Sequence, residues 1–123
     1  MKRKKKKTKD ECLDLWYEAV KLRDNYTCRY CGNKNPKYKN AHHIIPKTNW
    51  ALRYDLKNGI CVCSMPCHKN FFHSVDPNKF EEILSWYKNN VDWEYLQLRR
   101  HSQTKTDKTL IKIYLKQEIA RMK

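Results

Sequence analysis

The sequence has few of the features that mark flexible linkers, membrane spans or secretion signals. It contains only two glycines and four prolines, and it shows no Gly/Ser-rich stretch and no internal repeat. At 123 residues, one domain is therefore expected. No run of about 18 apolar residues occurs, so no segment is expected to span a bilayer. The N-terminus is basic without the apolar core of a signal peptide, which predicts an intracellular protein.

Acidic residues are also scarce. There are 13 aspartates and glutamates against 27 lysines and arginines, which gives a formal net charge of +14. Such a surface attracts polyanions, because binding releases the counterions that condense around phosphates. Nucleic acid is therefore the expected partner. The alternatives are attraction to an anionic membrane surface and a charge that only keeps the protein soluble.

The basic charge is densest at the N-terminus. Residues 1–9 (MKRKKKKTK) predict a disordered basic tail, because like charges repel and nothing in the segment can be buried. Such a tail either stays solvated or settles on phosphates when DNA is bound, and these two descriptions are compatible. Residues 10–123 are predicted to form the single folded domain.

Apolar periodicity predicts an α+β protein. A first helix over residues 10–24 would bury an apolar face whose members recur at helical spacing: Cys12, Leu15, Trp16, Ala19 and Leu22. Residues 41–45 and 59–63 predict two short strands, which a polar loop over 47–57 separates. Further helices are predicted over four segments: 67–73, 78–89, 91–100 and 107–122.

Paired cysteines predict a structural zinc site. Cys28 and Cys31 form one close pair, and Cys63 and Cys67 form a second. Two such pairs supply four tetrahedral sulfur ligands, which leaves no open position for water. Pairing of Cys61 with Cys67 is the alternative for the second half of the site.

One or two cysteines remain outside that zinc site. Cys12 lies on the apolar face of the first helix, which favours a small buried hydrophobe over a ligand. If Cys63 pairs with Cys67, then Cys61 is a spare buried thiol on a strand.

Histidines cluster in the same region. The adjacent pair His42 and His43 would point to opposite faces of a strand, so that one can bind metal while the other meets a water molecule. His68 and His73 can complete a metal site. Their spacing of five residues, however, does not place both side chains on one face of an ideal α-helix. Either the helix ends before His73 or only one of the two binds. Asn58 precedes a strand and can pin the loop by hydrogen bonds to backbone.

Short motifs stand in a fixed order along residues 22–75: Cys28-x-x-Cys31, Ala41-His42-His43-Ile44-Ile45-Pro46, Arg53-Tyr54-Asp55-Leu56, Asn58-Gly59-Ile60, Cys63…Cys67-His68 and His73. In this order they resemble the HNH endonuclease family, and most of all its zinc-ribbon-containing members that are common in phages. The resemblance implies a treble-clef-like ββα-metal finger with a zinc knuckle of four cysteines. An N-terminal helix and a helical C-terminal extension over 78–123 would flank it.

The resemblance also implies a role for each matching residue. His43 would be the general base that activates water, and Asn58 would order the loop. His42, His68 and His73 would bind a catalytic Mg²⁺ or Mn²⁺, with His68 as the last histidine of the motif. A structural Zn²⁺ would be held by four cysteines: Cys28, Cys31, Cys63 and Cys67.

The sequence departs from the family pattern at two places. The gap between Cys63 and Cys67 and the gap between His68 and His73 are each one residue longer than is usual in the family. These departures bear on the register of the helix and on the role of His73. They do not affect His43 or Asn58.

The function that the resemblance implies is one-metal hydrolysis of DNA, leaving 5′-phosphate and 3′-hydroxyl ends. If the protein is phage-encoded, it would act in the host cytoplasm. A non-catalytic zinc-binding DNA-binding module also explains the charge and the cysteines, but not the histidines. Charge alone also allows an RNA-binding or RNA-cleaving protein.

Double-stranded DNA is the expected substrate, held mainly through its phosphates. Contacts are predicted for basic side chains near and beyond the motif: Lys47, Arg53, Arg99 and Arg100. Arg53 either contacts the scissile phosphate or is an ordinary surface charge. Trp50 and Trp93 either stack on bases or belong to the core.

Overall fold

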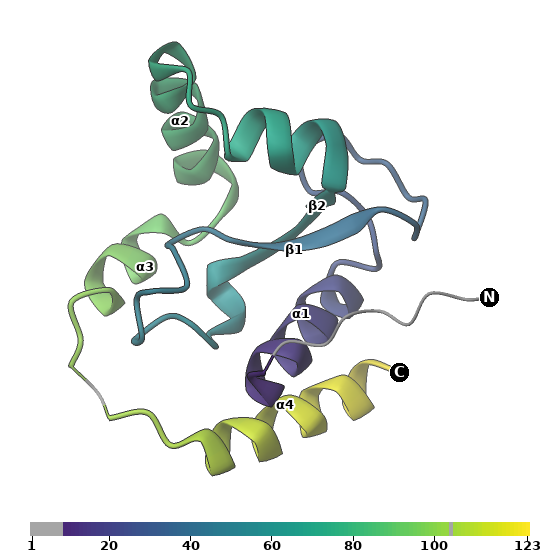
Figure 1. Ribbon diagram of the computed structural model, residues 1–123, viewed down its shortest axis with the longest axis vertical. Coiled ribbons are helices and arrows are strands. Elements are labelled where there is room, and N and C mark those ends of the chain that lie inside the picture. Colours follow the sequence, from purple (N-terminus) through teal and green to yellow (C-terminus); the bar gives the residue numbers. More distant parts are fainter. Residues whose placement is uncertain (1–8, 104) are drawn as a thin grey trace.

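The structure is a computed structural model that describes residues 9–103 and 105–123 (Figure 1). Apart from Lys9, the predicted basic tail lies outside these residues. The regular elements, in chain order, are α1 (Glu11–Arg23), β1 (Lys39–His43), the 3₁₀ turn η1 (Leu56–Asn58), β2 (Gly59–Cys63), the helix η2 (Ser64–Phe72), the 3₁₀ turn η3 (Pro77–Lys79), α2 (Phe80–Asn90), α3 (Trp93–Arg99) and α4 (Lys108–Met122). None of the helices within the described ranges is long and apolar enough to cross a membrane.

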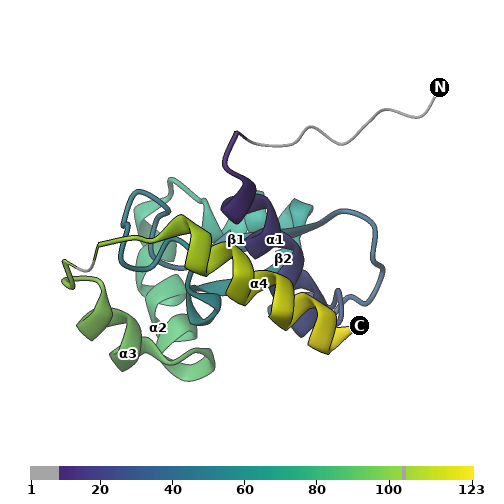
Figure 2. The same ribbon diagram turned by 90° about the horizontal axis from the view of Figure 1, so that it is seen from below.

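Helix α1 forms where the apolar spacing predicts it. Asp10 caps the helix by accepting a hydrogen bond from the backbone N–H of Leu13 (3.1 Å). Trp16 is fully buried on the face of α1 that meets the hairpin. On another side α1 packs against α4, with Leu115 and Ile119 in the same apolar cluster. Figure 2 shows these two helices side by side, although they stand at opposite ends of the chain.

Strands β1 and β2 pair as an antiparallel hairpin, with His43 opposite Gly59 and Lys39 opposite Cys63. β2 has the predicted bounds, but the prediction of β1 over 41–45 is wrong by two residues at each end. The backbone N–H of Ile44 still donates to the carbonyl oxygen of Asn58 (2.9 Å), but the N–H of Asn58 donates to Asp55 (3.0 Å) in the turn η1, so the ladder ends there. The next backbone N–H, that of Ile45, donates to the side-chain oxygen of Asn58 (2.8 Å).

Gly59 allows α1 to approach the hairpin closely. A Cβ atom at this position would lie 2.5 Å from Cζ2 of Trp16 and 2.6 Å from Cγ2 of Val20. No side chain fits at that distance, so the hairpin rests directly on the indole of α1. This contact also brings the strand end, with His43, over Trp16.

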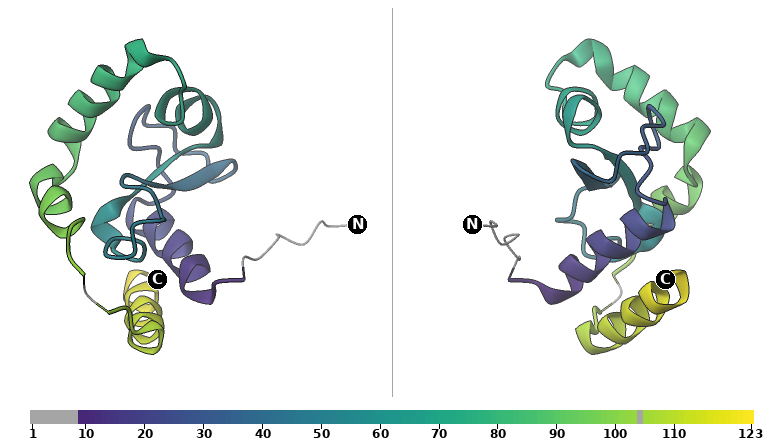
Figure 3. Two further views of the ribbon diagram at one scale, coloured as in Figure 1. Left: turned by 60° about the vertical axis from the view of Figure 1, so that its left-hand side comes forward. Right: turned by 90° about the vertical axis from the view of Figure 1, so that its right-hand side faces the viewer.

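The opposite side of the hairpin faces a second apolar cluster, to which η2, α2 and α3 contribute. Its buried members include Ile60, Val62, Phe72, Ile83 and Leu96. Figure 3 shows α2 and α3 as an arc beside the hairpin. The predicted helices over 78–89, 91–100 and 107–122 are thus all present, with ends shifted by at most two residues.

The predicted α+β class is confirmed. A small two-stranded sheet followed by a helix stands between an N-terminal helix and three C-terminal ones. The division into a tail over 1–9 and one domain over 10–123 stays a prediction.

Candidate metal centres and catalytic site

Four cysteines come together at the end of the hairpin that lies away from His43. The sulfur atoms of Cys28, Cys31, Cys63 and Cys67 all lie within 4.8 Å of one another. Gly32, with φ +80°, lets the chain turn so that the backbone N–H of Cys31 points at Sγ of Cys28 (3.4 Å). This knuckle and the end of β2 can hold a zinc ion with four ligands.

The electrostatics of this cluster fit a bound cation. Burial raises the pKa of the Cys28 thiol, but hydrogen bonds, first of all from the Cys31 backbone, outweigh burial and lower it to about 7. Burial raises the pKa of Cys67 far above its usual value, and hydrogen bonds and charge from Cys28 and Cys31 add to the effect. Deprotonation of the first thiol therefore disfavours deprotonation of the others, because the negative charges repel. A divalent cation would offset that repulsion.

The two remaining cysteines lie outside this cluster. Cys61 is fully buried, and burial together with the charge of Asp24 raises the pKa of its thiol to about 11. Cys12 is buried between α1 and α4, where its Sγ contacts the backbone oxygen of Lys108 (3.3 Å). The structure therefore groups Cys63, and not Cys61, with Cys67.

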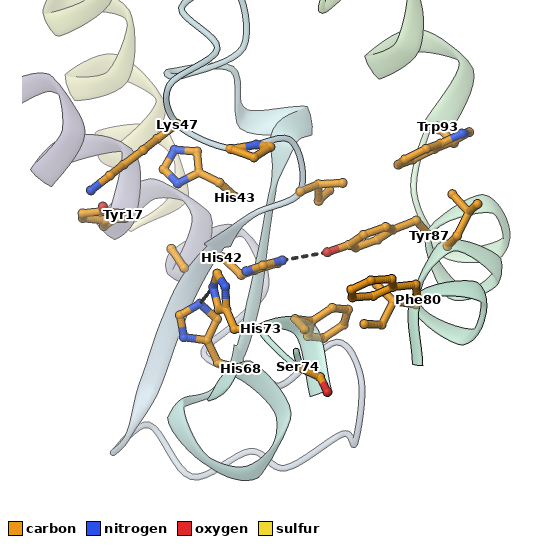
Figure 4. Close-up of a pocket in the computed structure, with 16 residues that line it drawn as sticks. Tyr17, His42, His43, Lys47, His68, His73, Ser74, Phe80, Tyr87 and Trp93 are labelled. Atoms are coloured by element: carbon orange, nitrogen blue, oxygen red, sulfur yellow. Dashed lines mark hydrogen bonds between the residues drawn. The ribbon is translucent and has the colours of Figure 1, made fainter. Parts of the chain in front are cut away.

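Three histidines form a second group on the same hairpin. Ring nitrogens of His42, His68 and His73 all lie within 4.8 Å of one another, and Nε2 of His68 is 2.9 Å from Nε2 of His73. His42 is buried, His68 is half-buried and His73 is exposed. Figure 4 shows the three rings meeting between β1 and η2. Three imidazoles at this separation can bind one metal ion.

A π-helical turn joins His68 to His73. The backbone N–H of His73 donates to the carbonyl oxygen of His68 (3.0 Å), which is the i to i+5 pattern of a π-helix. A spacing of five residues then corresponds to about one turn. Of the two alternatives predicted, the structure has the first: η2 ends at Phe72, before His73, and the wider turn brings the two rings together.

His42 has one ring nitrogen engaged and the other unpaired. Its Nε2 lies 2.7 Å from the hydroxyl oxygen of Tyr87 on α2. Its Nδ1 is buried and makes no hydrogen bond within the described part of the chain. Burial, followed by the charges of the neighbouring histidines, lowers the pKa of His42 to about 2, so the ring is neutral. With Nε2–H donating to Tyr87, the lone pair of Nδ1 is available to a cation.

His43 points to the other side of β1, as strand alternation predicts (Figure 4). Its ring stacks on Trp16, with centroids 3.8 Å apart and planes inclined by 10°. Its Nε2–H donates to the backbone oxygen of Arg53 (3.0 Å), which leaves the lone pair on Nδ1. Burial lowers the pKa of His43 to about 4, so the ring is a neutral base at pH 7.

Asn58 lies fully buried beneath the loop over 47–57. Its side-chain oxygen accepts from the N–H of Ile45 (2.8 Å), and its amide donates to the oxygens of Ile45 (2.9 Å) and Leu52 (3.1 Å). These bonds join the end of β1 to the middle of the loop. The backbone oxygen of Arg53, which fixes His43, directly follows Leu52 in the sequence.

Both kinds of histidine open into one cavity of about 740 Å³. His42, His68 and His73 line it from one side of β1, and His43 lines it near Lys47. The cavity therefore brings a group able to take a proton and a group able to bind metal to one solvent-accessible place. Metal-assisted hydrolysis of an anionic ester uses both.

The basic residues predicted to contact DNA differ in whether they line the histidine cavity. Lys47 is exposed and lines the histidine cavity. Arg99 lines a different cavity, and Arg100 contacts Gln97 (3.3 Å) at the end of α3.

Arg53 supports the loop in this structure. Its guanidinium pairs with Asp10 (3.1 Å) and donates to the backbone oxygen of Lys47 (3.0 Å), and 16% of its side chain is exposed. Trp50 is exposed beneath it, whereas Trp93 is half-buried against the core. The phosphate contact expected of Arg53 stays a prediction.

Sequence reasoning missed three residues that support the histidines. Trp16 and Tyr87 were visible only as apolar positions of predicted helices, and Asn40 carried no signal. Nδ1 of His68 lies 2.8 Å from the side-chain amide of Asn40. The one available clue was Tyr87, because a tyrosine on a buried helix face usually needs a partner for its hydroxyl.

The cysteine cluster predicts a specific pattern of zinc loss. Cys28→Ser should lower bound zinc from one equivalent to none and destabilise the fold, because zinc sites of this kind contribute directly to folding. Cys61→Ala is the matched control, since it removes a buried thiol outside the cluster and should keep the zinc. Metal content of the purified variants under reducing conditions measures both. Zinc retained in Cys28→Ser and lost in Cys61→Ala would contradict the assignment.

Comparison with known proteins places this site in a family. Residues 28–73 match the family model described as HNH endonuclease. No curated protein and no solved structure matches the chain. The matched segment begins at Cys28 and ends at His73, so it contains both metal-binding groups, His43 and Asn58. Residues 28–73 therefore form an HNH endonuclease domain.

Proposed function

We propose that the protein is a metal-dependent endonuclease that hydrolyses phosphodiester bonds in DNA, with His43 as the general base. The match to the HNH family supports nuclease activity and a nucleic acid substrate. One observation carries the finer proposal: His43 and the group formed by His42, His68 and His73 line the same cavity.

His43 is arranged to take a proton from water. It is neutral at pH 7, and the carbonyl of Arg53 fixes the tautomer by accepting Nε2–H. After Nδ1 accepts a proton from the attacking water, the same carbonyl stabilises the imidazolium. Trp16 restricts the ring to one plane by stacking on it, so that Nδ1 keeps its direction.

His42, His68 and His73 would hold the catalytic ion. The close approach of their ring nitrogens, and the unpaired buried Nδ1 of His42, fit a divalent cation. Such an ion supplies neutralisation of charge on the phosphate oxygens and on the leaving oxygen. Both Mg²⁺ and Mn²⁺ prefer oxygen donors, but Mn²⁺ is a transition-metal ion and accepts imidazole nitrogen more readily, so of the two we favour Mn²⁺.

The four cysteines would hold a structural Zn²⁺. Cys28 and Cys31 precede β1, whereas Cys63 and Cys67 follow β2, so the ion would tie the chain before the hairpin to the chain after it. It would fix the start of η2, from which His68 and His73 project. The zinc would therefore affect catalysis only by fixing where His68 and His73 lie.

The charge distribution supports DNA as the substrate. The net charge of +14 favours a polyanion, and Lys47 places one positive charge on the cavity itself. We propose Lys47 as the contact to a phosphate next to the scissile bond. Neither Arg99 nor Arg100 lines the cavity, so their contacts with DNA would lie away from the cut.

His43→Ala tests the proposed base. The wild-type protein should nick or cut plasmid DNA in Mn²⁺, and the variant should lose about 10²- to 10⁴-fold in rate, because a general base contributes that much. DNA affinity, zinc content and Tm should not change. Gel assays of supercoiled plasmid with Mn²⁺, Mg²⁺ or a chelator measure the rates, and an RNA of equal length tests the substrate.

His101→Ala is the matched control, because His101 is exposed and does not line the cavity. It should cleave as the wild type does. Full cleavage by His43→Ala would remove His43 from the mechanism. Salt-sensitive DNA binding by the wild type, without cleavage in either ion, would instead support a non-catalytic DNA-binding module.

Tyr87→Phe tests the support of His42. Loss of the hydroxyl frees Nε2 and lets the ring reorient, so affinity for Mn²⁺ should fall about 10- to 100-fold, as is typical when a residue that supports a metal ligand is removed. Titration of zinc-loaded protein, followed by the EPR signal of free Mn²⁺, measures this affinity without catalysis. Tyr95→Phe is the control, because Tyr95 bonds Asp55 away from the histidines. Equal affinities of the two variants would refute this role.

A further inference from the structure

The cavity beside the histidines has two unlike sides. One side carries imidazoles together with Lys47. The other side is apolar and is formed largely by α2 and by the start of α3: Phe72, Phe80, Ile83, Leu84, Tyr87 and Trp93. Figure 4 shows Phe80, Tyr87 and Trp93 on the side of β1 toward which His42 points, and Lys47 beside His43 on the other side.

The apolar side is open to solvent. Phe80 is 55% exposed and Leu84 is 38% exposed, and they stand one turn apart on the same helix. Behind them the rings of Tyr87 and Trp93 lie almost parallel, with an interplanar angle of 8° and centroids 5.7 Å apart. Single exposed apolar residues are common, but a contiguous set on the wall of a cavity marks a binding surface.

The charges of the side chains that line the cavity indicate which kind of ligand fits it. Lys47 is the one fully charged side chain among the described lining residues, and no aspartate or glutamate lines the cavity. The cavity is therefore suited to a molecule that has an anionic end and a flat apolar end. A nucleotide has this form, with its phosphate at one end and its base at the other.

We propose that the apolar side, with Phe80 and Leu84 at its mouth, binds one unstacked nucleobase adjacent to the scissile phosphate. This inference rests on the proposed function, which places that phosphate at the histidines. A base inside a duplex is stacked on both faces and paired along its edge, so it cannot enter. The substrate at the cut is therefore an unpaired nucleotide, either in a single strand or extruded from a duplex.

The size and composition of the cavity agree with this ligand. Its volume of about 740 Å³ lies within the range of sites that take small molecules. Aromatic side chains bind bases of any identity by stacking, so the subsite would favour unpaired DNA without selecting a sequence. Extrusion from a duplex costs least where a base is mismatched or already unpaired, and such sites should be cut first.

Abasic scanning tests this subsite. In the His43→Ala background, which prevents cleavage, fluorescence anisotropy would give the affinity for a labelled single-stranded oligonucleotide in Mn²⁺. Moving one abasic nucleotide along the strand should weaken binding about 5- to 100-fold at one position, the usual effect of losing a base stack. Phe80→Ala should cause a similar loss with the intact strand and no further loss with that abasic strand.

Two further variants complete the test. Leu84→Ala should reproduce the effect of Phe80→Ala, and circular dichroism checks that both fold. Ile113→Ala removes an exposed apolar side chain of α4 and should leave binding unchanged.

The outcomes separate this inference from the proposed function. A flat abasic scan, or equal losses in Phe80→Ala for intact and abasic strands, would overturn the subsite even if the wild type cleaves DNA. A position-specific abasic effect that Phe80→Ala abolishes, in a protein that never cleaves, would support the subsite and refute the nuclease.

Discussion

The side chain of Asn58 makes the hydrogen bonds on which the site depends. It pairs with both backbone groups of Ile45, just past the end of β1, and also holds the carbonyl of Leu52. Because the loop is held at that point, the carbonyl of Arg53 reaches His43 and selects its tautomer. A buried amide with three bonds to backbone is costly to disturb, since each lost partner leaves a buried polar group unpaired.

Because side chains alternate along β1, the two adjacent histidines point to different sides of the strand. His42 turns toward η2 and α2, where it meets two other imidazoles, and His43 turns toward α1. Each is supported by an aromatic residue from outside the matched segment: Tyr87 bonds His42, and Trp16 stacks on His43. The helices that flank residues 28–73 therefore do more than cover the core, because they hold the rings of His42 and His43 in place.

Much of the fold and site followed from local sequence patterns. The capped first helix, the second strand, the cysteine grouping and the separation of His42 from His43 all rest on spacing, which sequence records directly. The end of β1 did not, because the N–H of Asn58 donates to Asp55 in the turn η1 instead of to β1. The joining of His68 to His73 depends on a π-helical turn, and the support from Tyr87 depends on packing between distant helices. Those features arise from tertiary contacts that no short motif encodes.

We propose that the protein holds two different ions, one among sulfurs and one among imidazoles, and that His43 lines the same cavity as the second. A crystal structure of the zinc-loaded protein soaked in Mn²⁺, with anomalous data at the zinc edge and at a wavelength where manganese dominates, tests this arrangement. We expect a zinc peak among Cys28, Cys31, Cys63 and Cys67 and a separate manganese peak among His42, His68 and His73. An ordered histidine group without a manganese peak, or with the His43 ring turned out of the cavity, would contradict it.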